Sequence, residues 1–150
     1  MLHIGFYQLA EATVTDATIM LTQKARDAGK KMLIYCPKPA ASAIDDALWS
    51  HVAASWLPHG LDDAPGVEVS AAWICSDMVS NPISAEYVML LHGAVPQRWN
   101  GFRRIFVVFN GKSDTQLQRA RLQWQQWKKW PDTTLSYFLQ ADAGGWEKKA

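Results

Sequence analysis

The sequence predicts a three-layer α/β fold, in which a largely parallel, twisted central sheet carries helices on both faces. Three observations support this prediction. Strand-like and helical segments alternate along the chain. Residues 32–36 are apolar without interruption, as in a strand that is buried on both faces. The chain has 150 residues, 49% of them hydrophobic, so we expect residues 1–150 to form one domain with its own core.

The first segment predicts a strand followed by a helix. Residues 3–9 are short, mixed and aromatic, which favours a strand. Thr15 and Asp16 then offer an N-cap, and the apolar residues that follow have helical spacing. Gly29 is expected to end this helix at the C′ position, because glycine readily adopts the left-handed conformation found there.

Prolines mark the segment after the buried strand. Pro37 and Pro39 predict a turn, and residues 40–49 are typical of a short alanine-rich helix. Residues 55–60 are too short and too proline-bound for a central strand. We therefore expect an edge strand or an ordered loop there.

The rest of the sheet is expected to come from the second half of the chain. Alternating or continuous apolar residues predict strands at residues 67–75, 87–91, 104–109 and 135–139. The third of these segments has the strongest strand signal. A largely parallel sheet follows, because helices separate most of the strands.

One long helix is predicted in the C-terminal third. A turn at residues 110–111 precedes it, and Ser113 or Asp114 is placed to cap it. The helix is expected to continue to about Trp130, where Pro131 stops it.

Charge is divided unevenly along the chain. The net charge is only +1, but residues 1–97 carry −5 and residues 98–150 carry +6. Five of the eight tryptophans also lie in the basic third. A basic, aromatic segment is typical of a binding surface, and its acidic partner is either a phosphate backbone or an acidic peptide.

The motifs of common enzyme classes are missing from the sequence. It contains neither G-x-G-x-x-G nor G-x-x-x-x-G-K-[ST], so the predicted fold is nucleotide-binding-like without a phosphate loop. Cys36 and Cys75 are expected in the core, and the four histidines are too scattered to nominate a catalytic base or a metal cluster. We therefore expect no catalytic, cofactor or metal site.

The cellular location is predicted from the lack of a membrane-spanning segment and of a signal peptide in the sequence. No apolar run has the length of a membrane span, and the N-terminal residues lack the pattern of a signal peptide. A cytoplasmic protein is expected.

A candidate binding patch lies on the predicted C-terminal helix. Leu117, Ala120 and Trp124 form an apolar stripe at helical spacing, and Arg121 and Lys128 lie along its edge. Such a patch suits a ligand with an aromatic group and a carboxylate, which an arginine binds in bidentate fashion. The alternative is that Trp124 and Trp127 are core residues and that the cations are merely solvated.

Several motifs resemble the chi subunit of bacterial DNA polymerase III. The segments Ile44–Trp49 (IDDALW) and Trp56–Leu61 (WLPHGL) are similar to an Asp-acidic-Ala-Leu-Trp helix end and an aromatic-aliphatic-Pro-His-x-Leu motif of that family. The resemblance continues through Ala120–Arg121, the aromatic residues at 124 and 127, and the opening Phe6–Tyr7 strand. It therefore spans most of the chain.

The resemblance implies a non-catalytic accessory subunit that binds the acidic C-terminal tail of single-stranded DNA-binding protein. The tail-binding positions of the family correspond here to Arg121 and Trp124, with Gln125 where the family has a basic residue. Trp124 keeps an aromatic wall but lacks the phenol of the family's tyrosine, and Lys128 is the cation available to compensate.

A second surface is also implied by the resemblance. Trp49 and Trp56 match two aromatic residues with which the family binds the psi subunit, its link to the clamp loader. Contact with DNA would then be indirect. Two alternatives remain open: direct binding of single-stranded nucleic acid by the basic, tryptophan-rich third, and a degenerate nucleotide-binding enzyme.

Overall fold

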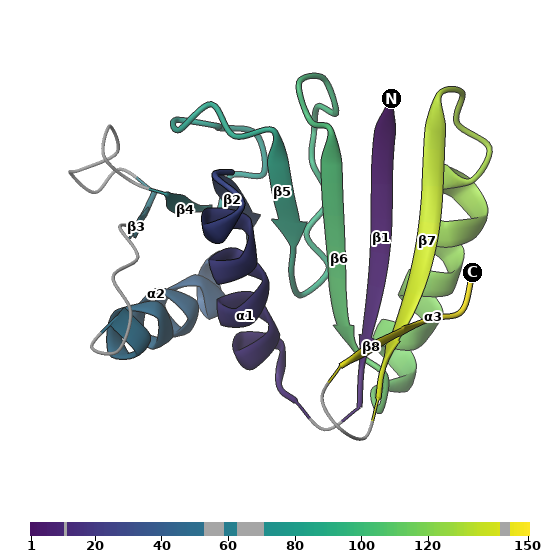
Figure 1. Cartoon of the computed structure of the whole chain (residues 1–150), viewed down its shortest axis with the longest axis horizontal. Coiled ribbons are helices and arrows are strands. Elements are labelled where there is room, and N and C mark those ends of the chain that lie inside the picture. Colours follow the sequence, from purple (N-terminus) through teal and green to yellow (C-terminus); the bar gives the residue numbers. More distant parts are fainter. Residues whose placement is uncertain (11, 53–58, 63–70, 142–144) are drawn as a thin grey trace.

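The computed structural model describes residues 1–10, 12–52, 59–62, 71–141 and 145–150. Its helices and strands alternate along most of the chain (Figure 1). In chain order they are β1 (Leu2–Leu9), α1 (Val14–Asp27), β2 (Met32–Tyr35), α2 (Lys38–Val52), β3 (His59–Leu61), β4 (Ala72–Cys75), β5 (Tyr87–Leu90), β6 (Arg104–Asn110), α3 (Asp114–Trp127), β7 (Thr133–Gln140) and β8 (Trp146–Lys148).

The described strands form a single open sheet in the order β3-β4-β2-β5-β6-β1-β7-β8. Every neighbouring pair is parallel except β7 and β8, which are antiparallel. Strand β1 lies between β6 and β7, so the first strand of the chain is central to the C-terminal half of the sheet. This arrangement confirms the predicted α/β class and the largely parallel sheet.

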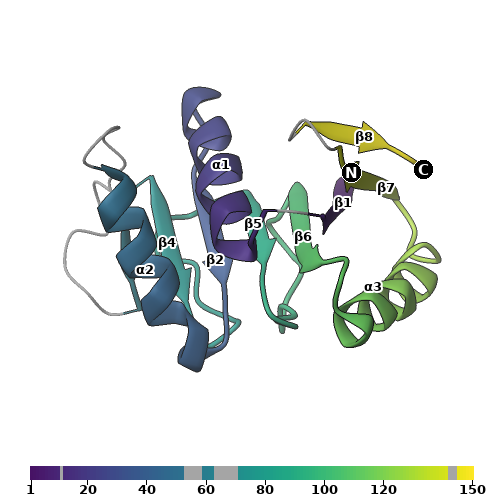
Figure 2. The same ribbon diagram turned by 90° about the horizontal axis from the view of Figure 1, so that it is seen from below.

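Each face of the sheet has its own apolar core. Helices α1 and α2 pack on one face, where Leu21 and Ile44 meet sheet residues such as Ile34 and Val108. Helix α3 packs on the opposite face through Ala120 and Trp127 (Figure 2). Strand side chains alternate between the two cores, as the pleat requires. The three layers are therefore helix, sheet and helix, as predicted.

The start of α1 differs from the prediction by two residues. Thr13 is the N-cap, not Thr15 or Asp16: its side chain accepts a hydrogen bond from Asp16 N, while the Asp16 carboxylate accepts from Thr13 N. This reciprocal pair is a capping box, which a threonine followed by an acid three residues later permits. Gly29 follows the helix with φ of +75°, so the predicted C′ glycine is confirmed.

The ends of the other two helices also differ from the prediction. Helix α2 begins at Lys38 rather than residue 40, because Pro39 fits the first helical turn, where no backbone donor is needed. Helix α3 is capped by Ser113 as predicted but ends at Trp127, before the expected Trp130. The Trp130 amide still donates to Trp127 O at 3.1 Å, so a turn leads from the helix to Pro131.

The strand predictions are confirmed where the structure describes them. Strands β2, β5 and β6 match the predicted apolar segments, and β3 is the edge strand that was one of two options for residues 55–60. Of that segment only His59 and Gly60 lie in the described part, and β4 begins at Ala72 within the predicted 67–75. Strand β8 was missed, because three residues after a glycine pair carry too little periodicity. None of the described helices is long and apolar enough to cross a membrane.

Candidate functional site

Helix α3 is held against the sheet by one apolar side. The Ser113 side chain accepts a hydrogen bond from Gln116 N at 3.3 Å, and Asp114 places a negative charge in the first turn, where the helix dipole favours it. Ala120 and Trp127 are buried, while Leu117 and Trp124 are half-buried beside them. The opposite side of α3 is free to carry polar and charged residues.

Trp124 lies at the border between core and surface. Its ring is 5.4 Å from the ring of Phe6 and 5.8 Å from that of Tyr137, edge-on to both. These contacts come from β1 and β7, so three elements fix the indole. Part of the side chain remains accessible. Trp124 therefore packs partly in the core, its role as a binding wall stays a prediction, and Trp127 is a core residue.

Tyr137 is a member of this site that sequence reasoning missed. Its hydroxyl donates a hydrogen bond to Gln8 Oε1, and burial raises the pKa of Tyr137 while the nearby charge of Arg121 opposes the rise. The charge of Arg121 therefore influences Tyr137, and the Tyr137 ring contacts the indole of Trp124. The only signal in the sequence was the predicted strand at residues 135–139, in which alternate side chains lie on the same face of the sheet.

The polar edge of α3 is exposed. Arg121, Gln125 and Lys128 are all exposed at spacings of four and three residues, so they lie along one side of the helix. Among the described residues, neither Arg121 nor Lys128 forms an ion pair. The edge therefore offers two cations without an ion pair to any described residue.

The other tryptophans of the basic third serve mainly in packing. The rings of Trp99 and Trp130 are 4.8 Å apart, and each also contacts buried Trp127, at 5.0 and 5.6 Å. This cluster surrounds the end of α3. Its rings are occupied by one another, which limits the aromatic area available to an external base.

The two cysteines and the turn after β1, where a nucleophile or a phosphate site would be sought, are engaged in structural contacts. Cys36 and Cys75 are buried as predicted, and burial raises the pKa of their thiols to about 11 and about 12. In the turn between β1 and α1, Ala10 N and Ala12 N both donate to Gln140 Oε1, at 2.9 and 3.1 Å. A glutamine side chain thus binds amides at the place where phosphate lies in nucleotide-binding folds. The described residues include no cluster suited to a metal ion.

Comparison with known families adds the deciding observation. The family model described as DNA polymerase III chi subunit, HolC, matches residues 1–131 of the 150-residue chain. The chain belongs to the DNA polymerase III chi subunit family. None of the curated proteins compared with the chain matches it.

Membership of the chi family gives the chain an accessory role in DNA replication, as a partner within the DNA polymerase III complex. The α3 residues of the candidate site lie inside the matched part of the chain. Tyr137 lies beyond residue 131, although β7 brings it to the same place.

The structure places the second predicted chi surface only in part. Trp49 belongs to α2, near its C-terminal end, but its side chain is not among those described. Trp56 lies outside the described residues. The expected pairing of these two tryptophans therefore stays a prediction.

Proposed function

We propose that this chi-family chain connects single-stranded DNA-binding protein to the clamp loader of the replicative polymerase. In this proposal, the edge of α3 binds the acidic C-terminal tail of single-stranded DNA-binding protein. Trp49 and Trp56 bind the psi subunit. The chain itself is non-catalytic and reaches DNA only through these partners.

The observation that carries the tail-binding proposal is the contact between the rings of Trp124 and Tyr137, next to the edge of α3 that bears Arg121. The Arg121 guanidinium is exposed and forms no ion pair among the described residues, so an exposed cation and two aromatic rings are available on one side of the molecule, which is the chemistry that a terminal aromatic residue and its carboxylate require. The exposed Lys128 adds attraction for the acidic residues that precede the terminus. A short peptide loses conformational entropy when it docks, so we expect a dissociation constant on the order of micromolar.

Calorimetric titration tests the proposal directly. The ligand is a short acidic peptide that ends in Ile-Pro-Phe, compared with the same peptide carrying an amidated C-terminus. We expect binding of the free acid and strongly reduced binding of the amide, because the amide removes the charge that Arg121 would bind. Equal affinity for both peptides would contradict the proposal.

A single-stranded oligonucleotide in the same titration tests the direct nucleic-acid alternative. Backbone recognition would show an affinity that falls by roughly 0.7 log units per contacted phosphate for each log unit of salt. We expect no such binding, because three of the tryptophans of the basic third, Trp99, Trp127 and Trp130, pack against one another. Oligonucleotide binding without peptide binding would favour the alternative.

The psi-binding half of the proposal needs its own experiment. Trp49→Ala and Trp56→Ala are each mixed with psi and examined by sedimentation velocity, and the tail peptide is titrated into the same variants. We expect weaker association with psi and unchanged peptide binding, since aromatic residues dominate the binding energy of most interfaces. Wild-type association with psi in both variants would disprove this role.

A further inference from the structure

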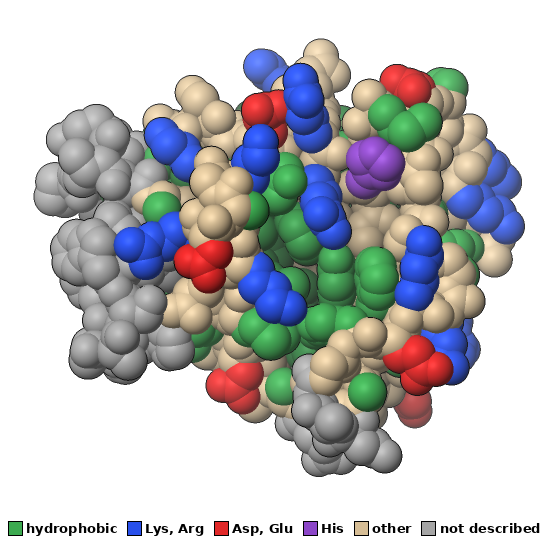
Figure 3. Space-filling view, in the orientation of Figure 1, with side chains coloured by type: hydrophobic (Ala, Val, Ile, Leu, Met, Phe, Trp, Pro, Cys, Tyr) green, Lys and Arg blue, Asp and Glu red, His purple; other side chains and the backbone are tan. Residues whose placement is uncertain are grey.

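A cavity of about 290 Å³ opens on the face of the sheet opposite α3. It lies between α1 and the C-terminal strands, over the starts of β5 and β6 and the middle of β1. Figure 3 shows a hollow with apolar side chains on its floor and Lys and Arg side chains around it. Its volume is close to the lower limit of ordinary small-molecule sites.

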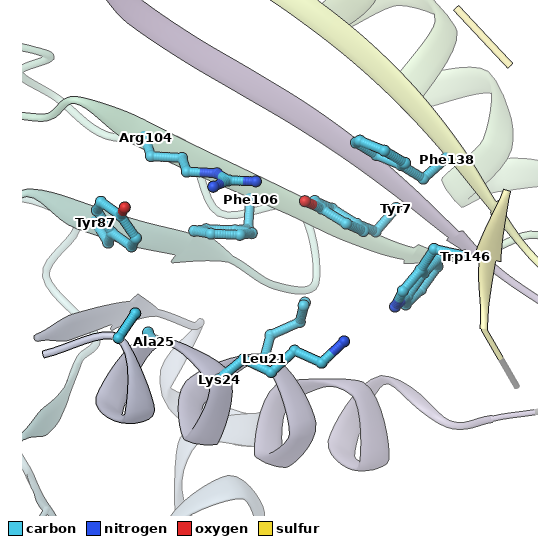
Figure 4. A pocket seen from close by; sticks show the side chains of 10 residues that line it. Tyr7, Leu21, Lys24, Ala25, Tyr87, Arg104, Phe106, Phe138 and Trp146 are labelled. Carbon is cyan, nitrogen blue, oxygen red and sulfur yellow. The ribbon is translucent and has the colours of Figure 1, made fainter. Parts of the chain in front are cut away.

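Aromatic rings form much of the cavity wall. The ring of Tyr7 stacks on Phe138 at 4.8 Å and on Phe106 at 5.6 Å, and it meets Trp146 edge-on at 5.1 Å. Leu21 of α1 adds an apolar side chain across the space (Figure 4). These packed rings fix one another, so the walls are preformed for a flat apolar group.

Two cations line the same cavity. The Arg104 guanidinium lies over the rings of Phe106 and Tyr87, 5.0 and 6.0 Å from their centroids, and it interacts with the Tyr7 hydroxyl. Lys24 reaches the cavity from α1 (Figure 4). None of the described residues that line the cavity is acidic, and within the described chain neither cation takes part in an ion pair. No group of the described residues that line the cavity therefore neutralises this positive charge.

Trp146 contributes an unsatisfied donor. Its indole Nε1 is buried and has no hydrogen-bond partner among the described residues. In Figure 4 this nitrogen faces the side chains of α1 across the cavity. A buried donor without a partner is costly, so such groups usually have an acceptor in the functional state. An oxygen of a bound anion would supply that acceptor.

We propose that this cavity binds a small organic anion, in which a flat ring carries a carboxylate or a phosphate. The ring lies against the aromatic walls, and the anionic oxygens accept hydrogen bonds from Arg104, Lys24 and the indole of Trp146. An adjoining hollow of about 270 Å³ shares Tyr7, Arg104 and Phe138 with the first and adds His3 and Ser136, so there is room for polar substituents.

This site is separate from the proposed tail-binding edge. The central sheet lies between them, because the cavity is on the α1 face and α3 covers the other. Two of its walls, Phe138 and Trp146, also lie beyond the residues that match the chi family. The proposal therefore stands or fails independently of peptide binding.

Binding is tested with two probes that share this chemistry. Indole-3-acetate offers a ring with a carboxylate, and thymidine monophosphate offers a ring with a phosphate. Each is titrated into the ¹⁵N-labelled full chain, and the indole N–H signals are followed by NMR, with Trp146→Phe used to assign the Trp146 signal. We expect one or both probes to shift that signal in a saturable manner. Indole, acetate and inorganic phosphate alone should bind at least ten-fold more weakly.

Variants locate the binding site. Arg104→Gln and Lys24→Gln should each weaken the better probe at least five-fold, and Lys24 is an exposed helix residue whose replacement leaves the fold intact. Arg119→Gln on α3 is the matched control and should leave probe affinity unchanged, because Arg119 lies near Gly93, away from the cavity. The proposal is overturned if neither probe shifts the Trp146 signal, if indole alone binds equally well, or if Arg119→Gln abolishes binding while Lys24→Gln does not. None of these results affects the peptide titration.

Discussion

The rings of Trp124 and Phe6 meet edge to face, with their centroids 5.4 Å apart and their planes at 65°. Phe6 is fully buried in β1, whereas Trp124 is only half-buried on α3. The aromatic residue proposed to receive a ligand is thus also a contact between the C-terminal helix and the first strand. If Trp124 binds the tail as proposed, its replacement should change both stability and binding.

Replacement of Trp124 should affect both properties. Trp124→Ala removes its contacts with Phe6 and Tyr137, and we expect it to lower the free energy of unfolding by about 2 kcal/mol, less than for a fully buried tryptophan. It should also abolish measurable tail binding. Trp124→Phe should recover part of each effect. Urea unfolding followed by circular dichroism, with calorimetry, measures both, and unchanged stability in Trp124→Ala would contradict the packing role.

Arg121 should affect binding alone. Arg121→Ala is expected to cost about 2 kcal/mol or more of tail-binding free energy, because the peptide carboxylate loses its charged partner. Stability should hardly change, since the side chain is exposed. Arg119→Ala is the control: it removes the same charge from the same helix, but Arg119 lies near Gly93 on another side of α3. Equal losses in the two variants would indicate a non-specific effect of charge.

A lysine at position 125 should strengthen tail binding. Gln125 is exposed between Arg121 and Lys128, so Gln125→Lys adds a third cation to the same edge. We expect the affinity for the acidic peptide to rise about three-fold, and the gain to shrink as salt screens the charge. Gln126→Lys adds the same charge one residue further around the helix and should give a smaller gain. Calorimetry at two salt concentrations distinguishes these outcomes.

Gly60 should tolerate no side chain. A Cβ at this buried position of β3 would lie 2.5 Å from the indole of Trp73, which is itself buried and donates from Nε1 to Asp62 O at 2.7 Å. We expect Gly60→Ala to lower the free energy of unfolding by about 1–3 kcal/mol, as for other overpacked sites. Gly145→Ala meets open space and serves as the control. A thermal melt of the two variants suffices, and equal midpoints would refute the clash.

The two cysteines predict a pH effect. Their thiols have an ordinary pKa of 9.0, and burial raises it to about 11 for Cys36 and about 12 for Cys75. As pH rises above 9, the unfolded chain therefore loses these protons first, and the free energy of unfolding should fall towards pH 12. At about pH 8, the native protein should react with a thiol reagent far more slowly than the denatured protein. Rapid labelling of both thiols in the native state would contradict this.

Much of the fold follows from local patterns. The buried strand β2, the strand β6 and the C′ position of Gly29 were predictable because apolar periodicity and glycine geometry act over a few residues. Helix ends were less predictable, since Thr13 and Thr15 are both possible caps and only the reciprocal contact with Asp16 selects one. Strand β8 was missed because its pairing with β7 comes from tertiary contact.

The sequence by itself determined the α/β class, the resemblance to the chi family and the choice of Arg121, Trp124 and Lys128, because these depend on residue type and spacing. Only the tertiary structure decided that Tyr137 stands beside Trp124 and that Trp146 and Lys24 line one cavity. Those residues come from strands and helices far apart in the chain. Their meeting depends on the strand order, which places β1 between β6 and β7 and which no local pattern encodes.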